Sequence, residues 1–199
     1  MKNQYFADAR DYFKYDALER ILVTDHAVEQ ITCIWMLTRP DLTGQGRVPF
    51  VPDPELPELT RFFQERLEAD RRRVSEMPAY LSRHGHRVFS YRDDREDFSF
   101  WTRAKYFAEI PDNALRHSVV FFDPDVGLEP GHPTEKHLLF AELEEVFQRM
   151  DESSTAVIFQ YSRREAGFWD SMAVQLRDRL ATDVLFIADS AVGVLRHST

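Results

Sequence analysis

The chain has 199 residues, of which 43% are hydrophobic, and its formal net charge is -9. This length suits one domain with a real core, and no apolar run approaches the roughly 18 residues that a membrane-spanning helix needs. The acidic balance argues against tight non-specific binding to nucleic acid, which depends on cationic side chains. The first residues lack the apolar stretch of a signal peptide, and the single Cys33 excludes an internal disulfide, so we expect a cytoplasmic protein.

Helices and strands are expected to alternate along the chain. Helices are predicted where apolar residues recur every three or four positions, and strands where β-branched and aromatic residues cluster between turn signals. The expected elements are a helix over 11–24, a strand over 30–38, a loop over 39–57, a helix over 58–83 with a break allowed at Pro78, a strand over 87–91, a helix over 98–109, a strand over 117–122, a helix over 134–150, a strand over 155–161, a helix over 167–181, and a hairpin over 183–188 and 192–196.

This alternation predicts a single α/β domain over 1–199 with a doubly wound, mainly parallel, Rossmann-like sheet. The C-terminal hairpin adds one antiparallel strand. Such a sheet occurs in the class I methyltransferase fold, although the pattern alone does not separate that fold from other doubly wound ones. The loop and long helix over 40–85 are predicted to form an insertion.

The strand over 118–122 runs directly into an acidic turn, Asp-Pro-Asp-Val-Gly at 123–127. A continuous apolar strand is expected to be buried on both faces, and ligands bind at the carboxyl edge of such sheets. Asp123 and Asp125 are therefore candidate catalytic residues. Together with Glu129 they could instead bind Mg²⁺ or Mn²⁺, and an Asx-type turn is the purely structural alternative.

Two further loops follow predicted strands. The Gly-x-Gly after the first strand would let the backbone approach a ligand closely, and the two arginines after the strand over 155–161 could hold a phosphate or carboxylate. An ordinary surface loop is the alternative in both places. The candidates are Thr38, Gly44 and Gly46 in the first loop, and Gln160, Arg163 and Arg164 in the second.

The first helix carries a polar face. Asp8, Asp11, Lys14 and Tyr15 recur at helical spacing, so they lie on the same side of the helix. An ion pair between Asp11 and Lys14, three residues apart, is the structural alternative to a functional role.

The pattern Asp8-x-x-Asp11-x-x-Lys14-Tyr15 resembles the Asn-x-x-Asp-x-x-Lys-His motif of bacterial ribosomal-RNA adenine-N6 methyltransferases of the J type, which use S-adenosylmethionine. The stretch from Thr38 to Gly46 is similar to that family's Thr-x-Ser-Gly-x-Gly. The chain also resembles a group of short bacterial and phage proteins with a Phe-x-Asp-Pro-Asp-x-Gly core. The resemblance implies an S-adenosylmethionine site formed by Tyr5, Asp8, Asp11, Lys14, Tyr15, Thr38, Gly44 and Gly46.

The acidic turn departs from the Asp-Pro-Pro-Tyr of that family. Asp123 matches and would orient the acceptor group, but Asp125 replaces the second proline and Val126 replaces the aromatic residue that stacks on an extruded base. The resemblance therefore supports the fold more than an adenine substrate.

Three hypotheses follow. The first is a methyltransferase-like protein that binds S-adenosylmethionine and acts on nucleic acid or a small molecule, with Gln160, Arg163 and Arg164 binding the substrate. The second is a metal-dependent phosphoesterase or nuclease that uses Asp123, Asp125 and Glu129. The third is a non-catalytic binding protein on the same fold. None of the three implies a membrane partner.

Overall fold

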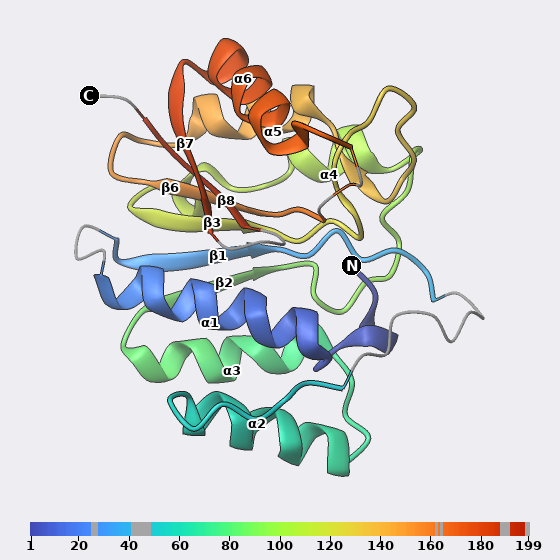
Figure 1. Cartoon of the computed structure of the whole chain (residues 1–199), viewed down its shortest axis with the longest axis vertical. Helices are drawn as coiled ribbons and strands as arrows, with labels where there is room; N and C mark the ends of the chain where they lie inside the picture. Colours follow the sequence, from blue (N-terminus) through green and yellow to red (C-terminus); the bar gives the residue numbers. More distant parts are fainter. Residues whose placement is uncertain (25–27, 41–48, 162, 164, 188–191, 198–199) are drawn as a thin grey trace.

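The computed structural model describes residues 1–24, 28–40, 49–161, 163, 165–187 and 192–197. Its centre is a six-stranded sheet in the order β2-β1-β3-β6-β8-β7 (Figure 1). Four parallel strands lie side by side, and β8 pairs antiparallel with both β6 and β7, so it lies between them. The predicted mixed α/β, Rossmann-like fold is confirmed. The strands are β1 (Gln30–Ile34), β2 (Arg87–Tyr91), β3 (Ser118–Phe122), β6 (Thr155–Phe159), β7 (Thr182–Ile187) and β8 (Val192–His197).

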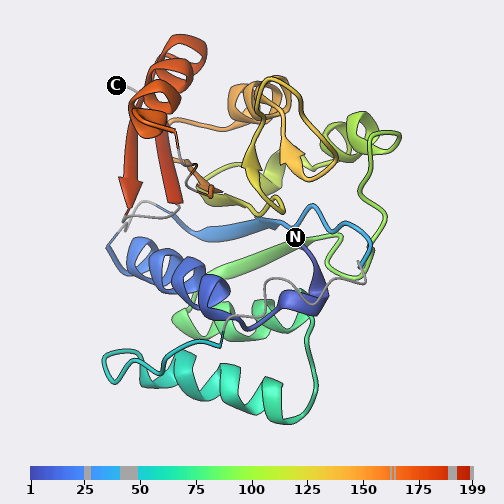
Figure 2. The same cartoon turned by 45° about the vertical axis from the view of Figure 1, so that its right-hand side comes forward.

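Helices cover both faces of the sheet, as Figures 1 and 2 show. One face carries α1 (Ala9–Thr24), α2 (Pro57–Glu68) and α3 (Met77–Leu81), and the other carries α4 (Arg103–Ala108), α5 (Phe140–Arg149) and α6 (Phe168–Leu180).

Each face has its own hydrophobic core. Along β3, Val119 and Phe121 belong to one core, and Val120 and Phe122 belong to the other. Because successive residues of a strand point to opposite faces, a strand that is covered on both sides must be apolar at every position. This explains the continuous apolar run that precedes the acidic turn.

The segment predicted as an insertion, residues 40–85, connects β1 to the neighbouring parallel strand β2. Within its described part, α2 and α3 lie on the same side of the sheet as α1 (Figure 1). Phe62 and Phe63 of α2 and Tyr80 of α3 share a core with Tyr15 of α1.

The helix expected over 58–83, with a break allowed at Pro78, is wrong, because the chain reverses direction between α2 and α3. The reversal lies before Pro78, with Asp70 at a positive φ of 53°, and Pro78 occupies the first turn of α3. Proline is tolerated there because the amide hydrogen that it lacks has no intrahelical partner in a first turn. The reversal lets both Phe62 and Met77 reach the core.

Two other helices are shorter than expected. In the predicted helix over 134–150, His137–Leu138 instead forms a two-residue strand, β5, which pairs with β4 (Gly127–Leu128). Helix α5 begins after it, where Glu129 and Glu142 accept hydrogen bonds from the amides of Phe140 and Leu139. In the predicted helix over 98–109, only α4 is helical.

The strands also end earlier than the sequence pattern suggests. The first strand was expected to reach Thr38 and the strand before α6 to reach Tyr161, but β1 ends at Ile34 and β6 at Phe159. Met36 has a positive φ of 45°, which takes the chain out of the extended conformation.

The chain changes direction across the sheet between β1 and β3. From β1 it passes outward to β2, and from β2 it returns to the other side of β1 to form β3. In open α/β sheets such a switch point leaves a crevice at the carboxyl ends of the strands, where ligands bind. None of the described helices has the length and apolarity that a membrane crossing requires.

Candidate functional site

The amino-terminal segment lies at the carboxyl edge of the sheet and leads into α1. Asp8 caps this helix, because its Oδ1 accepts hydrogen bonds from the amides of Arg10 at 2.9 Å and Asp11 at 3.0 Å. Asp11 Oδ2 in turn accepts a hydrogen bond from the amide of Ala7 at 3.1 Å. The two aspartates therefore fix the direction in which the helix leaves the sheet edge.

The ammonium of Lys14 lies between two carboxylates. Its Nζ is 2.8 Å from Asp11 Oδ1 and 2.8 Å from Asp123 Oδ1, and all three side chains are buried. The same Nζ lies 4.3 Å from the centroid of the Phe159 ring, a cation–π contact. This cluster ties α1 to the ends of β3 and β6.

One ammonium faces two carboxylates, and this unequal number of charges affects the pKa values of Lys14 and Asp123. Burial opposes the charged form of Lys14, but the pKa of its ammonium is raised by Asp11 and Asp123. Burial raises the pKa of Asp123 because it outweighs the attraction of Lys14. Asp123 Oδ2 and the Tyr15 hydroxyl are buried without a hydrogen-bond partner among the described residues.

Asp125 binds a different set of groups. Its Oδ1 lies 3.2 Å from the amino group of Met1, and its Oδ2 accepts a hydrogen bond from Thr38 Oγ1 at 2.9 Å and lies 3.7 Å from Lys2 Nζ. Burial disfavours the ionised form, but the Met1 amino group, the Thr38 hydroxyl and Lys2 together hold the pKa of Asp125 below its ordinary value.

The loop that follows Asp125 packs tightly on the end of β6. Gln160 Oε1 accepts a hydrogen bond from the amide of Leu128 at 2.6 Å, and Arg163 Nη2 donates to the Leu128 carbonyl at 3.1 Å. Gly127 has a φ of +123°, and a Cβ there would collide with the side-chain amide of Gln160. Gln160 and Arg163 thus hold the acidic turn in place through the backbone of Leu128.

The three carboxylates of the predicted metal site bind three separate partners. Asp123 faces Lys14, Asp125 faces the amino-terminal segment, and Glu129 Oε1 accepts a hydrogen bond from the amide of Phe140 at 2.7 Å. Within the part of the chain that the structure describes, no group of three His, Cys, Asp or Glu side chains is arranged to hold a metal ion.

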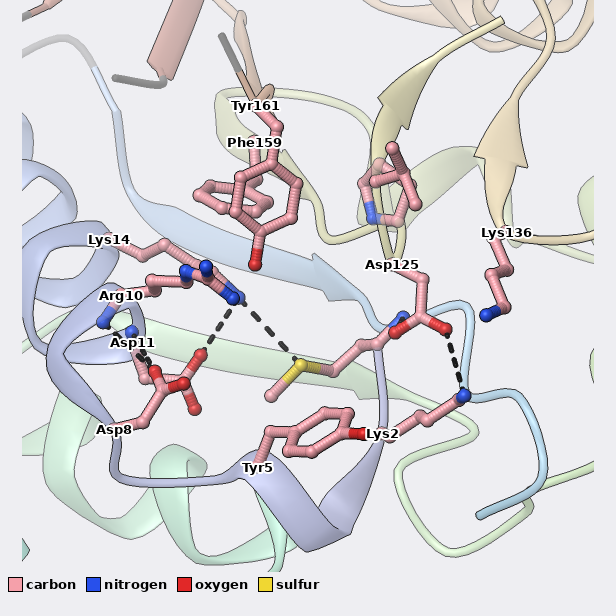
Figure 3. A pocket seen from close by; sticks show the side chains of 13 residues that line it. Lys2, Tyr5, Asp8, Arg10, Asp11, Lys14, Asp125, Lys136, Phe159 and Tyr161 are labelled. Carbon is pink, nitrogen blue, oxygen red and sulfur yellow. Dashed lines mark hydrogen bonds and ion pairs between the residues drawn. The ribbon is translucent and has the colours of Figure 1, made fainter. Parts of the chain in front are cut away.

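A cleft of about 390 Å³ opens above the Lys14 cluster, at the switch point of the sheet (Figure 3). Its lining combines acidic, basic and aromatic side chains, and the Tyr161 ring overhangs it. The lining residues are Met1, Lys2, Tyr5, Asp8, Arg10, Asp11, Lys14, Pro124, Asp125, Val126, Lys136, Phe159 and Tyr161.

The cleft brings together only some of the predicted site residues, namely Tyr5, Asp8, Asp11, Lys14 and Asp125. The others that the structure describes lie behind or beside it: Tyr15 in the aromatic core, Asp123 behind Lys14, Thr38 against Asp125, and Gln160 and Arg163 under the loop. Gly44, Gly46 and Arg164 lie outside the described residues.

Sequence reasoning missed Lys2, Arg10, Lys136, Phe159 and Tyr161. A signal was present for Phe159 and Tyr161, because they are two residues apart at the end of a strand and therefore share a face. Arg10 also precedes Lys14 by four residues, which places both on one side of the helix. For Lys136 the sequence offered no such periodicity.

Comparisons with protein-family models, with curated proteins and with solved structures find no match for this chain.

Replacing Lys14 by Met should lower the free energy of unfolding at pH 7 by about 3–5 kcal/mol, because it leaves two carboxylates buried without a cation. Urea denaturation measures the change. Lys105→Met is the matched control: Lys105 pairs with Glu109 on the surface, so its loss should cost less than about 1 kcal/mol. Adding Asp123→Asn to Lys14→Met should restore part of the loss, and a double variant no more stable than Lys14→Met would contradict this assignment.

Asp125→Asn should destabilise the protein in a pH-dependent way. Since the folded-state pKa of Asp125 is lowered, its ionised form contributes stability above the ordinary value of 3.8, and that stability is lost as the pH falls through the folded-state value. The gap in unfolding free energy between wild type and Asp125→Asn should therefore be about 1–3 kcal/mol at pH 7 and narrow below about pH 4. Asp178→Asn on the exposed face of α6 is the control, and a gap independent of pH would refute the assignment.

Gly127→Ala should lower the free energy of unfolding by about 3 kcal/mol, because the new methyl group meets Gln160 and the backbone requires a positive φ. Gly131→Ala is the matched control, since nothing lies within 4 Å of its added Cβ, and it should change stability by less than about 1 kcal/mol. Equal effects at the two glycines would show that the close approach to Gln160 does not constrain the turn.

Proposed function

We propose that the chain is an S-adenosylmethionine-binding, methyltransferase-like protein, and that the cleft at the switch point is its cofactor site. The observation that carries this proposal is the order of the sheet. A final antiparallel strand, β8, lies inside the edge of a parallel sheet, between β6 and β7. This is the arrangement of the class I methyltransferase fold, whose cofactor binds at the carboxyl ends of the strands.

The chemistry of the cleft fits such a ligand. The amino-acid part of S-adenosylmethionine is a zwitterion, and the lining offers both signs of charge, with four basic and three acidic side chains. The adenosyl part requires flat apolar surfaces, and Tyr5, Phe159 and Tyr161 provide aromatic rings. The volume of about 390 Å³ falls in the range of small-molecule sites.

When bound, S-adenosylmethionine supplies a methyl group that is activated by its positively charged sulfur. The residues of this chain would bind and orient it. Tyr5 and Tyr161 would pack against the ligand. The buried Lys14 cluster holds the floor of the cleft in place. Fixing the two reactants in a productive orientation supplies much of the rate of a displacement reaction.

A second candidate is ligand binding without catalysis. Asp123, the residue expected to orient a methyl acceptor, is fully buried, is bound to Lys14 and does not line the cleft. Asp125 does line it, but its carboxylate is bound by Thr38 and Lys2. These engagements favour a role in which the protein binds the adenosyl ligand and transfers nothing.

Binding can be tested by thermal shift and calorimetry with S-adenosylmethionine and S-adenosylhomocysteine. At a hundred times the dissociation constant, mass action adds about 2.7 kcal/mol to the free energy of unfolding, which raises the melting temperature. Tyr161→Leu should weaken binding about tenfold through loss of a stacking surface, whereas Trp101→Leu, an exposed aromatic outside the cleft, should not.

Adenosine and methionine added separately, and Mg²⁺ or Mn²⁺ alone, serve as ligand controls. No stabilisation by either adenosyl compound would refute the proposed function. Binding without methyl transfer to nucleic acid or small-molecule acceptors would favour the second candidate.

A further inference from the structure

Two cationic side chains line the cleft without an anionic partner. Among the residues that the structure describes, neither the Arg10 guanidinium nor the Lys136 ammonium lies within ion-pair distance of a carboxylate. In Figure 3 they lie on opposite sides of the cleft, Arg10 on the side of α1 and Lys136 on the side of β5. Both are therefore available to a ligand that enters between them.

The other charged side chains of the cleft are already engaged. Lys14 is bound by Asp11 and Asp123, Lys2 by Asp125, and Asp8 by the amides at the start of α1. The charged lining side chains outside ion pairs are then Asp8, Arg10 and Lys136, and their charges sum to a positive value, even though the whole chain carries a net charge of -9. A local cationic site on an acidic protein selects ligands that carry an anionic group.

Both cations are attached to well-anchored parts of the chain. The Arg10 guanidinium lies 4.7 Å from the centroid of the Tyr161 ring, which restricts its orientation. Lys136 sits on the segment leading into β5, where its carbonyl accepts a hydrogen bond from the amide of Val126 at 3.1 Å and its amide donates to Thr134 Oγ1 at 3.3 Å. For Arg10, this restriction before binding reduces the entropy that the ligand must overcome.

We propose that the ligand of this cleft carries a terminal carboxylate or phosphate, and that Arg10 and Lys136 attract and bind this group from their two sides of the cleft. Guanidinium and ammonium groups make strong charge-assisted hydrogen bonds to either anion. If the ligand is an adenosyl amino acid, which rests on the proposed function, the anion is its carboxylate. If the ligand is a nucleotide, the anion is its phosphate, and the same two residues bind it.

Isothermal titration calorimetry with three ligands distinguishes a bound carboxylate from a bound phosphate. S-adenosylhomocysteine carries the amino-acid carboxylate, 5′-methylthioadenosine has the same nucleoside without the amino acid, and adenosine 5′-monophosphate carries a phosphate. The variants are Arg10→Gln, Lys136→Gln and their combination, which remove charge but keep polar side chains. Arg177→Gln, at an exposed position on α6, removes the same charge away from the cleft.

For the ligand with the correct anion, each single variant should weaken binding about tenfold and the double variant about a hundredfold. Binding of 5′-methylthioadenosine, and binding to Arg177→Gln, should stay within about twofold of wild type. This pattern for S-adenosylhomocysteine would identify the carboxylate.

The two proposals fail in different ways. If S-adenosylhomocysteine does not bind but adenosine 5′-monophosphate binds and depends on Arg10 and Lys136, the anion site stands and the proposed function is wrong. If S-adenosylhomocysteine binds wild type and the double variant equally, the anion site is wrong and the proposed function stands. If none of the three ligands binds wild type, both are wrong.

Discussion

The buried ammonium of Lys14 is the contact on which the rest of the site depends. It joins Asp11 of α1 to Asp123 at the end of β3, and Lys14 and Asp123 are 109 residues apart along the chain. Neither carboxylate has another cation in ion-pair contact among the described residues. Displacing α1 from the sheet edge would therefore leave a buried carboxylate without a cation. This cation therefore holds one wall of the cleft in place, together with the apolar residues that α1 packs into the core.

Two cation–π contacts join α1 to the end of β6, one at the buried Lys14 and one closer to solvent at Arg10. Arg10 and Lys14 are one helical turn apart, a rise of about 6 Å, and Phe159 and Tyr161 are about 6.6 Å apart along an extended chain. Because these two spacings are similar, Lys14 lies over Phe159 and Arg10 lies over Tyr161. Lys14 over Phe159 is buried and structural, whereas Arg10 over Tyr161 is exposed in the cleft.

The sequence predicts the framework of this fold better than its boundaries or its site. Apolar runs such as 118–122 identify the buried strands because both faces of the sheet are covered. The late start of α5 was not foreseen, since His137 and Leu138 pair with β4 only through tertiary contact. Lys136 was missed for the same reason, because its place in the cleft depends on backbone pairing with Val126 that no local pattern encodes.

The acidic turn after β3 gains a specific structural meaning from these contacts. Asp123 holds Lys14, Asp125 holds Thr38 and Lys2, and Gly127 lets Gln160 approach the backbone. Each of these residues of the turn thus stabilises the walls of the cleft. The carboxylates of Asp123 and Asp125 are each paired with a cation of the protein. Because a compensated charge exerts little attraction on a ligand, selectivity falls to the cations that lack a partner. The acidic turn builds the site, and the basic side chains around it determine what the site binds.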